Sequence, residues 1–104
     1  MSVPDFGRFS EPAVLILVSL ANGEKHGYSM MEDIEAISGI KLGPGTLYGA
    51  LSRLEAQGLI EVVATDNRRK PYKLTPQGLT FLENTLEKMK SFTQTGLKRL
   101  GSSQ

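Results

Sequence analysis

The side chains of this 104-residue chain that could do chemistry are its cations, its carboxylates, its hydroxyls and a single histidine. His26 is the only histidine and there is no cysteine, so a metal site would need ligands that the sequence does not place beside it. A catalytic base at this position would also need a partner, and no nucleophile is paired with a base. A phosphate-cradling glycine loop is likewise absent from the sequence. We therefore expect no enzyme activity, no metal and no cofactor, and a structural role for His26 near the start of a helix.

Small and hydrogen-bonding residues occupy one face of a predicted helix within residues 43–61. Pro44 fits a first helical turn and Gly58 favours an end, which predicts about three to four turns between them. The buried face follows from apolar residues spaced i, i+3, i+4 and i+7, namely Leu47, Ala50, Leu51 and Leu54. The opposite face carries Thr46, Tyr48, Gly49, Ser52 and Arg53. A face of this kind, with almost no acid, is one that a DNA groove accepts.

A run of cations lies between two short predicted strands. Residues 59–65 alternate and are rich in β-branched side chains, and residues 72–74 return as a second strand, with Pro71 at an edge or at the first strand position. The turn between them carries Arg68, Arg69 and Lys70, and Lys73 follows on the returning strand. On a projecting hairpin these cations suit a phosphate backbone. A merely solvated loop is the alternative interpretation.

Tyr28 begins a predicted helix that extends to about Ser38, with Gly39 as its stop. Its ring fits an apolar stripe with Met31 and Ile34, and its hydroxyl could reach a phosphate from the helix start. Both roles are open, because tyrosine has an apolar ring and a polar tip.

The charge of the chain is divided unevenly along its length. The net charge is only +1, but residues 1–43 carry three basic and six acidic side chains, whereas residues 44–104 carry nine basic and five acidic ones. This asymmetry indicates either a polyanionic partner for the second half or an accidental bias of a solvated surface.

The first predicted helix should form the centre of the core, because residues 13–20 are apolar on nearly every side. Ser10 is its expected cap, and Pro12 lies in its first turn. Before this helix, residues 1–10 form an arm in which Phe6 and Phe9 pack. The longest apolar run, 13–18, is far shorter than the roughly 20 residues of a membrane span and lacks the pattern of a signal peptide. We expect a cytoplasmic protein with no membrane partner.

The last predicted helix begins at Thr75 as the cap and Pro76 as the first residue. About 25 helical residues span nearly 40 Å, which is longer than a domain of this size can cover. An apolar seam on such a helix predicts association with a second copy. Gly96 weakens the helix by about 1 kcal/mol, so we expect a bend or fraying there. The seam consists of Leu79, Leu82, Leu86, Met89, Phe92, Leu97 and Leu100.

Several motifs follow one another along the chain. They are His-Gly-Tyr at 26–28, Leu-Gly-Pro-Gly-Thr-Leu-Tyr at 42–48, the segment 51–60 with Arg-Leu-Glu and Gly-Leu-Ile, the basic run 68–70, and residues 72–75 with Gly78. Together these motifs resemble the PadR-like family of transcriptional regulators. The resemblance covers about residues 12–80 and implies a winged helix-turn-helix that binds DNA. A single C-terminal helix is similar to the small subfamily, whose members are dimers and some of which bind flat hydrophobic drugs between the subunits.

Three positions depart from the pattern of that family. Gly43 stands where a serine usually caps the helix, and glycine is acceptable there at a cost of a few tenths of a kcal/mol. The hairpin lacks the glycines that often precede the basic run, and Pro71 replaces a common aromatic residue, which implies a short, stiff wing. The chain has no tryptophan, so the aromatic sandwich of drug-binding relatives cannot be transferred to it.

The expected fold is mainly α with a small β-hairpin. It comprises a winged helix-turn-helix domain over residues 1–75 with its N-terminal arm, a dimerisation helix over 76–100 and a disordered tail over 101–104. The expected function is sequence-specific binding of double-stranded DNA by a homodimer that represses transcription at an inverted-repeat operator. One alternative is a winged-helix module that contacts a protein and never touches DNA. Another is a sensor in which a small hydrophobic effector at the dimer interface controls DNA binding.

Overall fold

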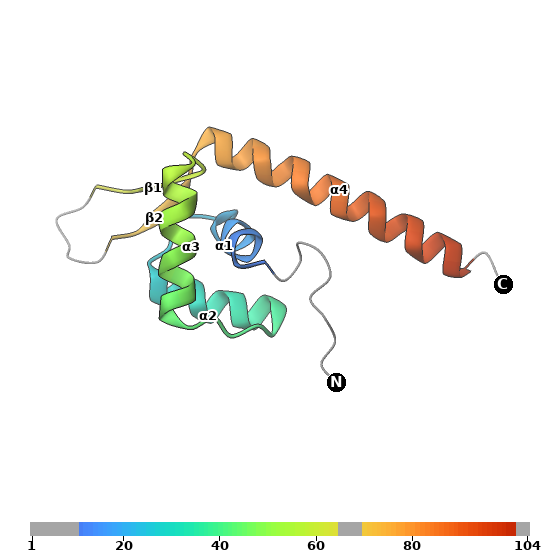
Figure 1. The fold of residues 1–104 in the computed structure, drawn as a ribbon, viewed down its shortest axis with the longest axis horizontal. Coiled ribbons are helices and arrows are strands. Elements are labelled where there is room, and N and C mark those ends of the chain that lie inside the picture. The colour runs from blue at the N-terminus through green and yellow to red at the C-terminus, as the bar shows by residue number, and fades with distance from the viewer. Residues whose placement is uncertain (1–10, 65–69, 102–104) are drawn as a thin grey trace.

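In the part of the chain that the structure describes, the fold consists of four helices and one two-stranded antiparallel sheet, in the order α1, α2, α3, β1, β2, α4 (Figure 1). These elements come from a computed structural model that describes residues 11–64 and 70–101. The predicted arm with Phe6 and Phe9, the cations Arg68 and Arg69, and the tail residues 102–104 lie outside the described residues. The arrangement is the predicted one, a mainly helical winged helix-turn-helix with a long C-terminal helix.

Helix α1 (Pro12–Leu20) lies at the centre of the core, as its sequence predicted, and contacts α2, α3, α4 and β2. Ser10, the expected cap, lies outside the described residues. Glu11 occupies the N-cap position and makes no side-chain cap. The physical reason is Pro12, which forces the residue before it into an extended conformation, here φ −66° and ψ 130°. The buried hydroxyl of Ser19 donates to Asp33 Oδ2 at 2.7 Å and ties α1 to α2.

Helix α2 (Gly27–Ser38) ends as predicted at Gly39, whose φ of 75° is left-handed. The predicted buried stripe is wrong at its start. Met30 and Ile34 are buried, Met31 is only half-buried, and Tyr28 is 68% exposed. The stripe is therefore displaced by one residue at this end of the helix, and the core-packing interpretation of Tyr28 does not hold.

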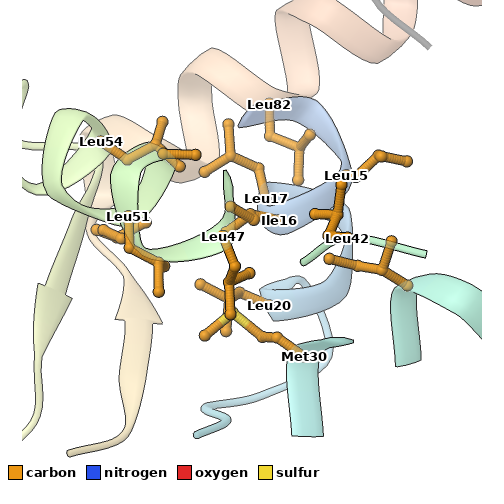
Figure 2. Packing of buried hydrophobic residues seen from close by; sticks show 13 residues of the cluster. Leu15, Ile16, Leu17, Leu20, Met30, Leu42, Leu47, Leu51, Leu54 and Leu82 are labelled. Carbon is orange, nitrogen blue, oxygen red and sulfur yellow. The ribbon is translucent and has the colours of Figure 1, made fainter. Parts of the chain in front are cut away.

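Helix α3 (Pro44–Ala56) follows after residues 39–43 and completes the helix-turn-helix. Its predicted buried face is confirmed, and Gly43 takes the N-cap position without a side-chain cap. Gly58 has φ 76° just beyond the helix, a conformation that glycine adopts readily. Figure 2 shows Leu47, Leu51 and Leu54 of this helix packed with residues of α1.

Strands β1 (Ile60–Val62) and β2 (Tyr72–Leu74) pair antiparallel, with Glu61 opposite Lys73. The pairing is shorter than the predicted 59–65. Pro71 lies directly before β2, and its carbonyl accepts a hydrogen bond from Val63 N–H at 2.8 Å. Strand β2 is not an edge at Tyr72, because this residue exchanges two backbone hydrogen bonds with Lys25, at 2.9 and 3.1 Å.

Helix α4 (Pro76–Gly101) has 26 residues, about 39 Å at 1.5 Å per residue. The predicted cap is confirmed, since Thr75 Oγ1 accepts a hydrogen bond from Gly78 N–H at 3.0 Å. The helix continues through Gly96, so the fraying expected there is not observed, and Gly101 is its last residue. The radius of gyration is 15.6 Å, against about 13 Å for a compact chain of this length. The excess comes from α4, which extends away from the domain (Figure 1).

The buried face of α4 is limited to its first half. Leu82 is only 2% exposed and belongs to the core beside α1 (Figure 2), so it cannot also contribute to a seam for a second copy. Gly78 and Thr85 are buried on the same side, and Met89 is half-buried. The other predicted seam residues are exposed, namely Leu79, Leu86, Phe92, Leu97 and Leu100. No helix in the two described ranges combines the length and hydrophobicity that a bilayer crossing requires.

Candidate nucleic-acid interface

The exposed face of α3 has a centre line of small side chains. At about 100° per residue, Gly45, Gly49, Ser52 and Ala56 lie within one narrow strip opposite the buried face. Three of these four are exposed and Gly49 is half-exposed, so the backbone of the helix is open to close approach. Gly45 and Ala56 were not predicted, because a glycine and an alanine have no chemical signature. Their i, i+4 and i+7 spacing with Gly49 and Ser52 was the available signal.

Larger groups border this strip on both sides. Thr46 and Arg53 lie on one flank, and both are exposed. The Arg53 guanidinium lies back along the helix, since a Cβ built on Gly49 would be 3.8 Å from Nη1. Tyr48 lies on the other flank and is 48% exposed. Residues predicted from the sequence thus form one continuous surface, with hydroxyls and a single cation around a shallow centre.

A cleft of about 570 Å³ opens beside Tyr48, between the start of α2, helix α3 and strand β2. It contains all three tyrosines of the chain, and we call it the tyrosine cleft. Its lining residues are His26, Gly27, Tyr28, Ser29, Tyr48, Lys70 and Tyr72. The sequence predicted Tyr28, Tyr48 and Lys70 as contact residues but missed the other four. Of these, His26, Gly27 and Ser29 are next to Tyr28 in the chain, whereas the packing of β2 against Lys25 brings Tyr72 to this place.

The close approach of Tyr48 to α2 depends on Gly27. A Cβ at this buried position would lie 2.4 Å from the Tyr48 hydroxyl oxygen and 2.9 Å from Cζ, well inside the 3.4 Å at which ordinary contact begins. The missing side chain of Gly27 therefore makes room for the ring tip. Because Gly27 is the first residue of α2, the Tyr48 hydroxyl lies next to the helix N-terminus, where unpaired backbone N–H groups favour an anion.

The hydroxyl of Tyr72 is held in its neutral form. Burial raises the pKa of this phenol above its ordinary value of 10.0, and the nearby Glu55 carboxylate and Tyr48 add to the effect. A neutral phenol can donate a hydrogen bond to a phosphate oxygen. The cleft thus combines phenol donors, the exposed ammonium of Lys70 and a helix N-terminus, and its chemistry suits a phosphate group.

His26 occupies the N-cap position of α2 but does not cap it with its side chain. Its Nδ1 is buried and has no hydrogen-bond partner among residues 11–64 and 70–101. Within those same ranges no group of three or more histidine, cysteine, aspartate or glutamate side chains could hold a metal ion.

Two groups of predicted contact residues are not part of this surface. Lys73 points away from the cleft, because neighbours on a strand alternate, and it lies opposite Glu61 and lines a separate hollow with Leu20 and Glu24. Arg68 and Arg69 lie outside the described residues, between the two strands in the chain. The structure therefore brings together Tyr28, Tyr48 and Lys70, and beside them Thr46, Gly49, Ser52 and Arg53.

Comparison with known proteins identifies this architecture. The profile of the Transcriptional regulator PadR-like family matches residues 16–84, which extend from α1 into the first half of α4. The chain belongs to the PadR-like family. The family match includes the whole helix-turn-helix and the hairpin, and it ends where α4 leaves the domain.

Relatives of this PadR-like chain differ in length. It is 44% identical over 82 residues to an uncharacterized 37.1 kDa protein in transposon TN4556 of Streptomyces fradiae, covering 79% of this chain and 24% of that protein. It is 41% identical over 66 residues to transcriptional regulator Rv3488 of Mycobacterium tuberculosis, covering 61% of each. The chain thus spans less than two thirds of both proteins. A PadR family transcription regulator from Clostridium difficile has a crystal structure that superposes with a TM-score of 0.78 at 27% identity, covering 88% of this chain and 99% of that one.

Proposed function

We propose that the protein binds double-stranded DNA and represses transcription as a homodimer on an inverted-repeat operator. The observation that carries the proposal is the continuity of two surfaces, the exposed face of α3 and the tyrosine cleft beside it. The exposed face of α3 carries small side chains and hydroxyls that suit a DNA groove, and the tyrosine cleft carries phenols and a cation that suit a phosphate group. Membership of a family of transcriptional regulators supports the same conclusion.

In this proposal α3 enters the major groove along its strip of small residues. Gly45 and Gly49 allow the backbone close to the base edges, and Ser52 and Thr46 supply hydroxyls. Arg53 is the only cation of α3, and no asparagine or glutamine lies on its exposed face before Gln57. Specificity therefore depends more on hydroxyl contacts, van der Waals contacts and DNA shape than on a dense set of bidentate hydrogen bonds.

Contacts with the DNA backbone beside the groove supply most of the affinity in this proposal. A phosphate enters the tyrosine cleft and accepts hydrogen bonds from phenols and from the start of α2, with Lys70 nearby. The sequence adds Arg68 and Arg69 next to Lys70, so three cations serve the same stretch of backbone.

An inverted repeat requires two copies of the chain, and in this proposal the two copies associate through helix α4. Strands β1 and β2 and helix α4 extend from the domain in opposite directions (Figure 1). The tyrosine cleft contains no residue of α4, so we expect a partner on the last turns of α4 to leave it uncovered. Phe92 is 82% exposed, and Leu97 and Leu100 are also exposed in the last turns. Burial of such side chains against a second copy is worth about 1.5–3 kcal/mol each, which favours a dimer. We expect such a dimer to bind half-sites about one helical turn apart.

The test is fluorescence anisotropy with a labelled promoter fragment from upstream of the protein's own coding sequence, repeated across salt concentrations. Replacing Arg68 and Arg69 together by alanine should weaken binding and reduce the salt slope by about two for each subunit, or about four for the dimer. The matched control replaces Lys88 and Lys90 of α4, which lie away from the proposed interface, and should leave the slope unchanged. Equal slopes for both double variants would refute the assignment of the hairpin.

Two other results would redirect the proposal. Failure of the protein to bind any promoter fragment, at low salt and as a dimer, would favour the winged-helix module that contacts a protein. Release of the bound fragment by flat aromatic compounds would support a small hydrophobic effector at the dimer interface. A reporter gene behind the same promoter distinguishes repression from activation.

A further inference from the structure

Four hydrogen bonds connect the segments at the junction between α3 and α4. Thr75 Oγ1 donates to Gly58 O at 2.6 Å and accepts from Gly78 N–H at 3.0 Å, and Thr75 N–H donates to Leu59 O at 3.1 Å. Leu59 N–H in turn donates to Leu54 O of α3 at 3.0 Å. The side chain of Thr75 is 9% exposed, so water cannot easily replace these bonds. The turn that follows α3 and the first turn of α4 are thus connected through one hydroxyl.

Gly78 brings the two segments into direct backbone contact. A Cβ at this position would lie 1.9 Å from the Leu59 carbonyl oxygen and 2.9 Å from its carbon. The atoms it would meet belong to the backbone and have no rotamer to change. Any side chain at residue 78 therefore has to push α4 away from the end of α3.

We infer that Thr75 and Gly78 are positioning residues that set the angle between α3 and α4. A dimer joined through α4 then holds its two reading helices at a distance and direction that these two residues determine, without touching DNA themselves. The consequence for DNA rests on the proposed function, because it requires a dimer that reads two half-sites. The angle itself is a property of a single chain and can be measured without DNA.

The displacement expected for Gly78→Ala follows from the geometry. Ordinary contact begins at 3.4 Å, so a Cβ at 1.9 Å requires a retreat of about 1.5 Å, the difference of these distances. Leu82 anchors α4 in the core about 6 Å further along the helix, which makes the tilt about 14°. Residue 98 lies about 24 Å beyond this pivot and moves by about 6 Å.

The angle is measured by electron–electron double resonance between spin labels. The chain has no cysteine, so Ala56→Cys on α3 and Lys98→Cys on α4 place one label on each helix, both at exposed positions. Dilution with excess unlabelled protein keeps only distances within one chain. We expect a narrow distribution for the otherwise unchanged protein, a broadened one for Thr75→Val, and a shift of up to about 6 Å for Gly78→Ala. Thr75→Ser keeps the hydroxyl and should restore the narrow distribution.

The result that overturns the inference is a broad distribution in the otherwise unchanged protein, or unaltered distributions in Thr75→Val and Gly78→Ala when circular dichroism shows both folded. If Thr75→Val fails to fold, the width in the unchanged protein and the shift in Gly78→Ala decide the question.

The DNA experiment uses the promoter fragment of the anisotropy test, in which DNase footprinting first locates the two half-sites. It compares this fragment with versions that have one base pair added or removed between the half-sites. Gly78→Ala should lose at least tenfold in affinity for the native spacing, bind a single half-site as well as before, and prefer an altered spacing. An equal loss on the single half-site would overturn the inference. Absence of binding by the unchanged protein would instead refute the proposed function, while the spin-label result would still test the angle.

Discussion

The contact between Gly27 and Tyr48 leads to a prediction that separates DNA affinity from stability. In Gly27→Ala the new Cβ lies 2.4 Å from the Tyr48 hydroxyl oxygen, so the ring tip has to move by about 1 Å, the difference from the 3.4 Å of ordinary contact. The ring is 48% exposed and can rotate outward without moving the backbone. Since alanine also favours a helix by up to about 1 kcal/mol, we expect the free energy of unfolding to change by less than about 1 kcal/mol.

The expected effect on DNA binding is larger. If the Tyr48 hydroxyl donates to a phosphate, the displaced ring loses a hydrogen bond to a charged group, worth about 1.5–3 kcal/mol in each subunit. Two symmetric copies lose about 3–6 kcal/mol, which weakens the affinity for an inverted repeat by about 140- to 20,000-fold. The measurements are anisotropy titration at constant salt and urea unfolding of the same preparations.

The control is the same substitution in a Tyr48→Ala background, where no ring remains for the new Cβ to displace. Gly27→Ala should then have little further effect on affinity, and the two changes should be strongly non-additive. Unchanged affinity in the single variant, or fully additive losses in the double variant, would refute the reasoning that connects Gly27 to DNA through Tyr48.

Three further predictions concern the core, the dimer and the titration of Tyr72. Leu82→Ala removes a buried side chain and should lower the free energy of unfolding by about 2–5 kcal/mol in urea titrations, whereas Leu86→Ala, at an exposed position, should cost about 1 kcal/mol or less. Leu97→Asp with Leu100→Asp should convert the dimer to a monomer, seen as half the mass in light scattering, with the helix-turn-helix still folded. Because the pKa of Tyr72 is raised in the folded state, its contribution to stability is complete below pH 10 and is lost as the pH rises through the folded pKa. Tyr72→Phe should therefore flatten the alkaline decrease in melting temperature.

Each of these has an outcome that would contradict it. Equal destabilisation by the Leu82 and Leu86 variants would place both side chains in the same environment. For the dimer, Lys98→Asp is the matched control on the opposite side of α4, and monomer formation by this variant as well would indicate a charge effect rather than loss of an apolar seam. An alkaline decrease that persists in Tyr72→Phe would have to come from other groups.

The recognition helix and the last helix cap were predictable because their signals are local. Leu47, Ala50, Leu51 and Leu54 of α3 repeat with the period of a helix, so their spacing alone defines the buried face. Thr75 at the start of α4 bonds a backbone N–H three residues away, and such a contact needs no distant partner. Local periodicity and capping chemistry therefore determined these elements and their faces before any tertiary contact was known.

Ambiguity arose where two helical faces were almost equally apolar. In α2, Met30 and Met31 are neighbours, and only packing against α1 and α3 decided that Met30 is buried and that Tyr28 faces solvent. In α4, Leu79, Leu82 and Leu86 fit both a seam for a second copy and a face for the domain. The core placed Leu82 inside and left its two neighbours exposed, because α1 contacts only one side of the helix.

The site and the junction depend on residues distant in the chain. Tyr28, Tyr48 and Tyr72 come from three different elements, and no spacing rule connects them. The same holds for Gly78 and the Leu59 carbonyl oxygen, whose approach depends on the path of the chain between β1 and α4. The sequence by itself determined which helices form and which face α3 buries, since those properties depend on neighbours within two turns. Only the tertiary structure decided which side chains share a cleft and at what angle α4 leaves the domain, because those properties follow from packing between elements.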